Sequence, residues 1–376
     1  MLEVIYVTRH GFRSNWLVDP SNGSYTPYIR SPTGVGADPA LTAHGVDQAN
    51  ELAVRLLELD PPVERVYSSL YYRCLQTVEP FVRKTQEVAQ TFISSSDSSS
   101  SSTGPATGTG AGAGTTGAAA RLPLRIRGET GLGEWYGSAD FDHPVPAPLE
   151  KLDELFPGLL KLDYRPAVTP NRKGESIDEL HERVAAALEA LIAECDRDGV
   201  RAVLLCSHAA VIIALGRVLT GQMPDSHDVE DFKCFTCGLS AYRRRRWLSG
   251  SGPAADGASV DQRRRDGPAG DWRGGRGVSG GWDCELNSDC RHLSQGEERG
   301  WYGSHIFVFL GSKVSLLLKT QANARRRRFS GDESFKHVPT GPSLLDAGTR
   351  LGEDAGNSVS GTEGSGELGE GVRGKL

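Results

Sequence analysis

Short apolar runs alternate with amphipathic segments along the first 247 residues, and this alternation restricts the possible folds more than any other feature. Strands are predicted at residues 4–7, 63–67, 122–126 and 201–206, and helices at 42–59, 71–89, 176–196 and 209–219. This pattern predicts an α/β fold in which helices on both faces cover a mostly parallel sheet. In such a sheet, ligands bind beyond the carboxyl ends of the strands.

Helix signals support these boundaries. Thr42 is suited to cap the first predicted helix. Ser176 and Glu179 have the spacing of a capping box. Gly221 follows the last predicted helix, where a glycine commonly ends one.

Three predicted strand ends carry polar residues of one chemical character. Arg9 and His10 follow the first strand, Arg73 lies just after the second, and His208 follows the strand at 201–206. Guanidinium groups match the geometry of phosphate oxygens and remain charged. The sequence therefore predicts a pocket for a phosphate dianion.

The same residues predict a reaction. A neutral histidine could attack phosphorus, and water would then hydrolyse the phosphohistidine, provided that an acid protonates the leaving oxygen. Glu134, within residues 131–135, is the best candidate acid. No metal or cofactor is expected, because the guanidinium groups supply the positive charge. The alternative is a retained fold whose pocket no longer turns over.

Four segments resemble a known family in their order and spacing. Residues 7–11, 68–77, 131–135 and 207–212 are similar to motifs of the histidine phosphatase (phosphoglycerate mutase-like) superfamily, and the resemblance covers about residues 1–247. It implies that His10 is the nucleophile. It also implies phosphate or substrate contacts for a set of further polar residues, namely Arg9, Arg73, His208, Arg13 and Asn15.

Composition separates other segments from this predicted domain. Residues 94–120 are almost entirely Ser, Thr, Gly and Ala, which predicts a disordered insertion, and residues 248–280 read as a flexible linker. Residues 341–376, rich in Gly and acidic side chains, predict a disordered tail. The Cys-x-x-Cys pair at 234 and 237 has no second pair at zinc spacing, so a reduced pair is expected there.

Residues 281–340 resemble the small β-barrel of fungal TFIIIC subunits, which belong to the RNA polymerase III assembly factor and join a histidine phosphatase domain to this barrel. The resemblance implies a small β-rich domain that binds other TFIIIC subunits, and a nuclear location. An exposed linker with incidental tryptophans is the alternative for this region. Residues 303–328 interrupt the pattern as an insertion or retained intron, unless 306–310 and 314–318 form a genuine hairpin.

Charge and cysteine content limit the remaining options. The net charge of −6 argues that DNA contact is at most indirect. Seven scattered cysteines favour an intracellular protein, and no apolar window is long enough to span a membrane. The alternative function is a free cytoplasmic phosphatase that acts on a small phosphorylated metabolite or a phosphoprotein.

Overall fold

The computed structural model describes residues 1–19, 22–97, 123–225, 232–245 and 271–300. Its elements, in chain order, are β1 (Val4–Arg9), β2 (Trp16–Asp19), β3 (Ser24–Pro27), α1 (Ala43–Leu57), β4 (Arg65–Ser68), α2 (Tyr72–Asp97), β5 (Ile126–Gly128), η1 (Thr130–Leu132), α3 (Leu149–Leu155), α4 (Ile177–Arg197), β6 (Ala202–Ser207), α5 (Ala209–Thr220), β7 (Leu239–Arg244), η2 (Val278–Gly280) and β8 (Trp282–Asp289).

Over these ranges, six strands form one sheet in the order β5-β4-β6-β1-β7-β8. Strands β5, β4, β6 and β1 are parallel to one another, whereas β7 runs antiparallel to β1 and β8 antiparallel to β7. Strands β2 and β3 form a separate hairpin. The prediction of an α/β fold with a mostly parallel sheet is confirmed.

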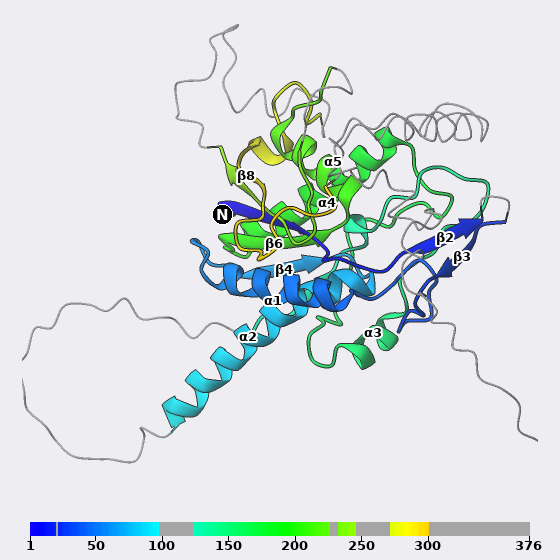
Figure 1. Cartoon of the computed structure of the whole chain (residues 1–376). Helices are drawn as coiled ribbons and strands as arrows, with labels where there is room; N and C mark the ends of the chain where they lie inside the picture. The colour runs from blue at the N-terminus through cyan, green and yellow to red at the C-terminus, as the bar shows by residue number, and fades with distance from the viewer. Residues whose placement is uncertain (20–21, 98–122, 226–231, 246–270, 301–376) are drawn as a thin grey trace, which may run out of the picture.

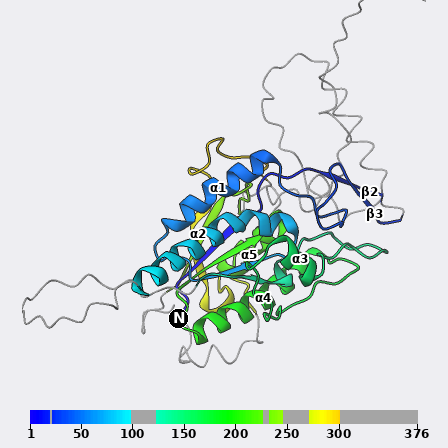
Figure 2. The same ribbon diagram turned by 90° about the horizontal axis from the view of Figure 1, so that it is seen from below.

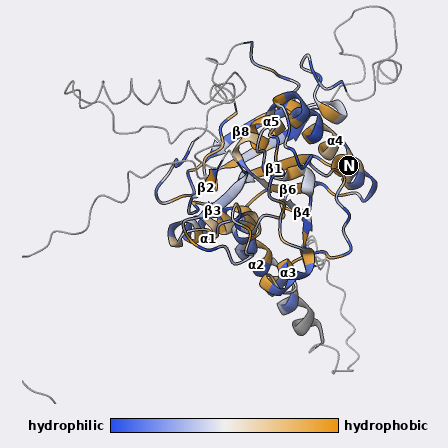
Figure 3. Ribbon diagram, turned by 90° about the vertical axis from the view of Figure 1, so that its right-hand side faces the viewer, coloured by the Kyte–Doolittle hydropathy of each residue, from blue (hydrophilic) through white to orange (hydrophobic). Residues whose placement is uncertain are grey.

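Helices α4 and α5 lie on one side of the sheet and α1, α2 and α3 on the other (Figure 1), and a hydrophobic core fills each side. Apolar residues of α4 and α5 form the core on one face, and those of α1, α2 and α3 form the core on the other. Seen from below, α1 and α2 lie side by side (Figure 2). Figure 3 shows hydrophobic residues gathered on the central strands, while the helices carry both hydrophobic and hydrophilic residues.

The predicted helix caps are present. The Thr42 side chain accepts a hydrogen bond from the backbone N–H of Gly45 at the start of α1. Ser176 and Glu179 form the full capping box of α4. Gly221 ends α5 in the left-handed conformation, with φ of 76°. Among the described residues, no helix is sufficiently long and apolar to cross a membrane.

Residues 271–289 differ from the expected linker and separate domain. Strand β8 pairs with β7 and is the sixth strand of the sheet. Its Trp282 is fully buried beside α5, in the core that α4 and α5 form. Trp272 is also buried, with its ring stacked on His181 at 5.7 Å. Composition and a short resemblance do not show which distant elements a segment packs against, so both predictions missed these contacts.

The other segments set apart by composition lie largely outside the described residues. This holds for residues 98–120 of the predicted insertion, 248–270 of the linker, 303–328, the remainder of the expected barrel, and the tail from 341. The first part of the insertion belongs to α2, which extends to Asp97 rather than ending near residue 89.

Candidate active site

The ends of four parallel strands carry the predicted site residues. His10 follows β1, and Ser69 follows β4 and precedes the first turn of α2, which holds Arg73. Glu134 comes after β5 and η1, and His208 separates β6 from α5. Because the carboxyl ends of parallel strands share one edge of the sheet, the fold brings these side chains together. Two helices, α2 and α5, also begin at this edge, and helix N-termini favour anions.

His10 is held in one tautomer by its own loop. The ring is buried, and Nδ1 lies 2.9 Å from the carbonyl oxygen of Gly11. A carbonyl oxygen can only accept a hydrogen bond, so Nδ1 carries the hydrogen and the lone pair resides on Nε2. Burial, together with the charges of Arg73 and Arg9, holds the pKa of His10 well below its ordinary value. The imidazole is therefore neutral and can act as a nucleophile.

The loop after His10 packs tightly against α1, and this requires glycine on both sides. A Cβ on Gly11 would lie 2.8 Å from the carbonyl oxygen of Gly45, and a Cβ on Gly45 would lie 2.0 Å from that of Phe12. The backbone N–H of Gly11 also donates to the hydroxyl of Thr77 at 2.9 Å. These contacts fix the loop that supports the His10 ring.

Arg73 is the central cation of the cluster. Its buried guanidinium donates to the carbonyl oxygen of Ala37 at 3.1 Å and pairs with Asp38 at 3.4 Å and with Glu134 at 3.1 Å. Its Nη2 lies 3.2 Å from Nδ1 of His208. The buried Nε of Arg73 has no hydrogen-bond partner among the described residues, so a donor remains available to an anion.

His208 and Glu134 form a buried ion pair. Nδ1 of His208 lies 3.2 Å from Oε2 of Glu134, and Nε2 lies 2.8 Å from the hydroxyl of Ser69. Burial opposes the charged imidazolium, but Cys74 and Glu134 outweigh it and raise the pKa of His208. Burial likewise opposes the charged carboxylate, but His208 and Arg73 lower the pKa of Glu134. Each member of the pair thus favours the charged form of the other.

Arg9, Arg13 and Asn15 occupy three different positions. Arg9 donates to the carbonyl oxygen of Cys234 at 3.0 Å, and its charge contributes to the lowered pKa of His10. The guanidinium of Arg13 lies 4.0 Å from the centre of the Trp16 ring and acts electrostatically on both His10 and Glu134. Asn15 reaches this region through Arg13, whose Nη1 lies 3.4 Å from its Oδ1.

Several site residues were not predicted from the sequence. Asp38 is fully buried, and burial raises its pKa to about 6 although Arg73 lowers it. The buried ring of Trp16 lies beneath both Arg13 and Arg73, with the Arg73 guanidinium 5.3 Å from the ring centre. Position next to Pro39 in a turn-rich stretch was the only local signal for Asp38.

Aromatic side chains lie beside this cluster. The Tyr71 ring meets that of His208 edge to face at 5.4 Å, and its hydroxyl accepts from that of Tyr136 at 2.9 Å. Tyr136 in turn meets Tyr25 edge to face and stacks on His143 at 5.0 Å. Tyr71 and Tyr136 thus lie beside the cluster and are hydrogen-bonded to each other.

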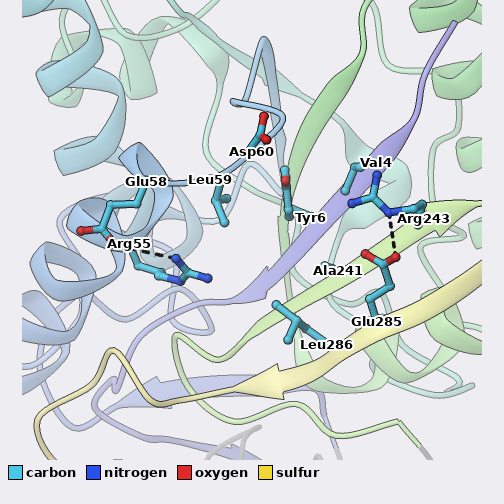
Figure 4. Close-up of a pocket in the computed structure, with 10 residues that line it drawn as sticks. All are labelled: Val4, Tyr6, Arg55, Glu58, Leu59, Asp60, Ala241, Arg243, Glu285 and Leu286. Carbon is cyan, nitrogen blue, oxygen red and sulfur yellow. Dashed lines mark hydrogen bonds and ion pairs between the residues drawn. The ribbon is translucent and has the colours of Figure 1, made fainter.

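A separate hollow lies toward the other end of α1 (Figure 4). It has a volume of about 150 Å³ and is lined by β1, β7, β8, the last turn of α1 and the residues that follow α1. Its two arginines are already paired, Arg243 with Glu285 at 2.7 Å and Arg55 with Glu58 at 3.7 Å. We assign no ligand to this hollow.

The chain is similar in sequence to a known family and to two characterised proteins. Residues 5–92 and 115–247 match the histidine phosphatase superfamily (branch 1). The chain is 30% identical over 308 residues to the transcription factor tau 55 kDa subunit of Saccharomyces cerevisiae, covering 80% of this chain and 58% of the relative. It is 28% identical over 254 residues to the ecdysteroid-phosphate phosphatase of Drosophila melanogaster, covering 59% of this chain and 27% of the relative.

The chain thus spans less than two thirds of the length of either relative. Among solved structures, the ecdysone phosphate phosphatase from Bombix mori in complex with tungstate matches with a TM-score of 0.43 and 19% identity, covering 69% of this chain and 96% of that one. The family match includes the segments that carry His10, Arg73, Glu134 and His208, in the order predicted from the motifs. The chain belongs to the histidine phosphatase superfamily.

Proposed function

We propose that this chain hydrolyses phosphomonoesters through a phosphohistidine formed on His10. The observation that carries the proposal is the buried, neutral His10 ring, whose Nδ1 is tied to a carbonyl oxygen beside the cations Arg73 and His208. Nε2 attacks phosphorus, and the bond from phosphorus to the leaving oxygen breaks. Water then attacks the phosphohistidine, the phosphorus–nitrogen bond breaks, and inorganic phosphate is released.

Glu134 supplies the proton for the leaving oxygen in this scheme. In the resting cluster its carboxylate is ionised because it is paired with His208 and Arg73. A bound phosphate dianion competes for both cations and repels the carboxylate, and both effects raise the pKa of Glu134. The bound substrate therefore favours the protonated form of this acid. It donates that proton in the first step and takes one from the attacking water in the second.

The remaining roles follow from charge. Arg73, with its available Nε, and His208 hold the phosphoryl oxygens directly. Arg9 and Arg13 add positive charge beside His10, and Asn15 holds Arg13. Four cationic side chains together stabilise the charge of the transferring phosphoryl group.

Replacing His10 by Ala tests this mechanism. Hydrolysis of an aryl phosphate should fall by about 10³-fold or more, since the chemical step loses its nucleophile. Rapid quenching with radiolabelled substrate should give an alkali-stable, acid-labile phosphoenzyme in the natural chain and none in the variant. An unchanged melting temperature would show that the variant is folded. Unchanged turnover or labelling would refute the role of His10.

We further propose that the chain acts within TFIIIC as a subunit that carries this phosphatase domain. The 30% identity to the yeast tau 55 kDa subunit over 80% of the chain supports this assignment. On this proposal the protein acts in the nucleus and its partners are other TFIIIC subunits. Contact with DNA is then indirect. Affinity purification of the full chain should co-isolate those subunits.

The alternative is a free phosphatase that acts on a small phosphorylated metabolite or a phosphoprotein. It is supported by the 28% identity to the ecdysteroid-phosphate phosphatase of Drosophila melanogaster. Isolation of the chain without TFIIIC subunits would favour this alternative. Both functions use the same reaction at His10. The affinity purification therefore decides between them, whereas the His10→Ala assay tests the reaction that they share.

A further inference from the structure

Residues 291–300, here called the strap, follow β8 and run along one face of α1. Leu293 is buried in the core on the α1 side of the sheet. The backbone N–H of Ser294 donates to the carboxylate of Glu51 on α1 at 3.1 Å. This first part of the strap is therefore anchored near the middle of the helix.

Glu298 carries the strap to the beginning of α1. Its Oε2 accepts from Nε2 of Gln48 at 2.6 Å and lies 2.5 Å from Nε2 of His44. Its backbone carbonyl accepts from the N–H of Thr236 at 3.1 Å. Because the helix positions 44, 48 and 51 lie on one face, these bonds align the strap with the helix axis and direct it toward the active site.

Arg299 then touches the residues that flank the nucleophile. Its carbonyl oxygen accepts from Nη1 of Arg9 at 2.5 Å. Its own guanidinium donates to the carbonyl oxygen of Arg13 at 3.3 Å and to Oδ1 of Asn15 at 3.4 Å, and lies 3.7 Å from the centre of the Phe12 ring. Oδ1 of Asn15 thus lies within hydrogen-bond distance of both Arg13 and Arg299.

The backbone of Arg299 also has an unusual conformation. Its φ is 48°, in the left-handed region that non-glycine residues rarely enter. The surrounding contacts must hold it there. This conformation lets one residue present its carbonyl oxygen to Arg9 and its side chain to the loop at residues 12–15.

We propose that Arg299 is a positioning residue of the phosphate site. It fixes the guanidinium of Arg9 through its carbonyl oxygen, and it fixes the loop that carries Arg13 and Asn15 through its side chain. The inference rests on the proposed phosphatase function. It also goes beyond the family match, which ends at residue 247, because the strap lies outside the matched residues.

The test compares Arg299→Ala with Arg291→Ala in the full chain. Arg291 is the matched control, because it is an arginine of the same strap, its side chain is 80% exposed, and it pairs only with Asp289 among the described residues. In Arg299→Ala, the KM for p-nitrophenyl phosphate and the inhibition constant for inorganic phosphate should both rise by about 3- to 10-fold, with a smaller change in kcat. Arg299→Lys keeps the cation over Phe12 and should recover part of the loss.

Hydrogen exchange of residues 9–15 supplies a readout that needs no substrate. It should be faster in Arg299→Ala than in the natural chain and unchanged in Arg291→Ala. If the natural chain does not hydrolyse the ester, the proposed function fails, whereas the exchange experiment still decides the role of the strap. Exchange and kinetic constants in Arg299→Ala that equal those of Arg291→Ala would overturn the proposal.

Discussion

Replacing Glu134 by Gln separates proton donation from phosphate binding. Oε1 of Glu134 accepts from the backbone N–H of Trp135 at 3.1 Å, and Oε2 faces Arg73 and His208. Glutamine has the same shape and can retain the bond from Trp135, so the loop should keep its position. Its amide is no proton donor to an alkoxide. The variant therefore tests the chemistry with little change in geometry.

The size of the effect depends on the leaving group. A general acid contributes about 10²–10⁴ in rate, which corresponds to roughly 3–5 kcal/mol of the barrier. An alkoxide needs that whole contribution, whereas nitrophenolate departs as a stable anion. For Glu134→Gln, kcat/KM should thus fall by about 10²–10⁴-fold with an alkyl phosphate but by less than about 10-fold with p-nitrophenyl phosphate. Because kcat/KM reports only the phosphorylation step, loss of the base for the second step does not affect the comparison.

Stopped-flow measurement adds a second check. With p-nitrophenyl phosphate, the variant should release about one equivalent of nitrophenolate per active site in a burst, because the phosphohistidine forms faster than water removes it. Glu154→Gln is a suitable control, since its side chain is 66% exposed and pairs only with Lys151 in the described part of the chain. Equal losses for the two substrates, without a burst, would refute the assignment of Glu134 as the acid.

Two further predictions concern stability. Trp282→Ala should lower the free energy of unfolding by about 3–5 kcal/mol in urea denaturation, because it empties a fully buried site in the core that α4 and α5 form. A loss below 1 kcal/mol would show that β8 packs independently of this core. The folded pKa of Asp38, about 6, lies above its unfolded value, so its contribution to stability is complete below pH 4 and is lost as the pH rises through 6. The free energy of unfolding of Asp38→Asn, measured relative to that of the natural chain, should therefore increase by roughly 3 kcal/mol from pH 4 to pH 7. Two stability curves that run parallel over this pH range would contradict this prediction.

Features fixed by neighbouring residues could be predicted from the sequence. The caps at Thr42 and Ser176 depend on hydrogen bonds within three residues, and the strand ends depend on short apolar runs. His10 and Arg73 lie close together because parallel strands end at one edge, which is a rule of the fold rather than of the local sequence.

Features fixed by distant contacts could not be predicted. The resemblance put Trp282 in a separate β-rich domain, and only the pairing of β8 with β7 assigns it to the phosphatase sheet. Asp38 acquires its role from Arg73, which is 35 residues away in sequence. Arg299 lies 290 residues from Arg9, whose guanidinium it contacts, and nothing near it in the sequence indicates this contact.

The central place of β1 in the sheet has a consequence for synthesis of the chain. The strand lies between β6 and β7, whose first residues follow it by about 200 residues or more. At a rate of 5–20 residues per second, the ribosome needs roughly 10–40 s to deliver β6 after β1 has been made. During that interval the apolar run from Val4 to Val7 has neither of its strand neighbours. A strand without its neighbours can pair with other chains, so β1 exposes the nascent protein to aggregation during this interval.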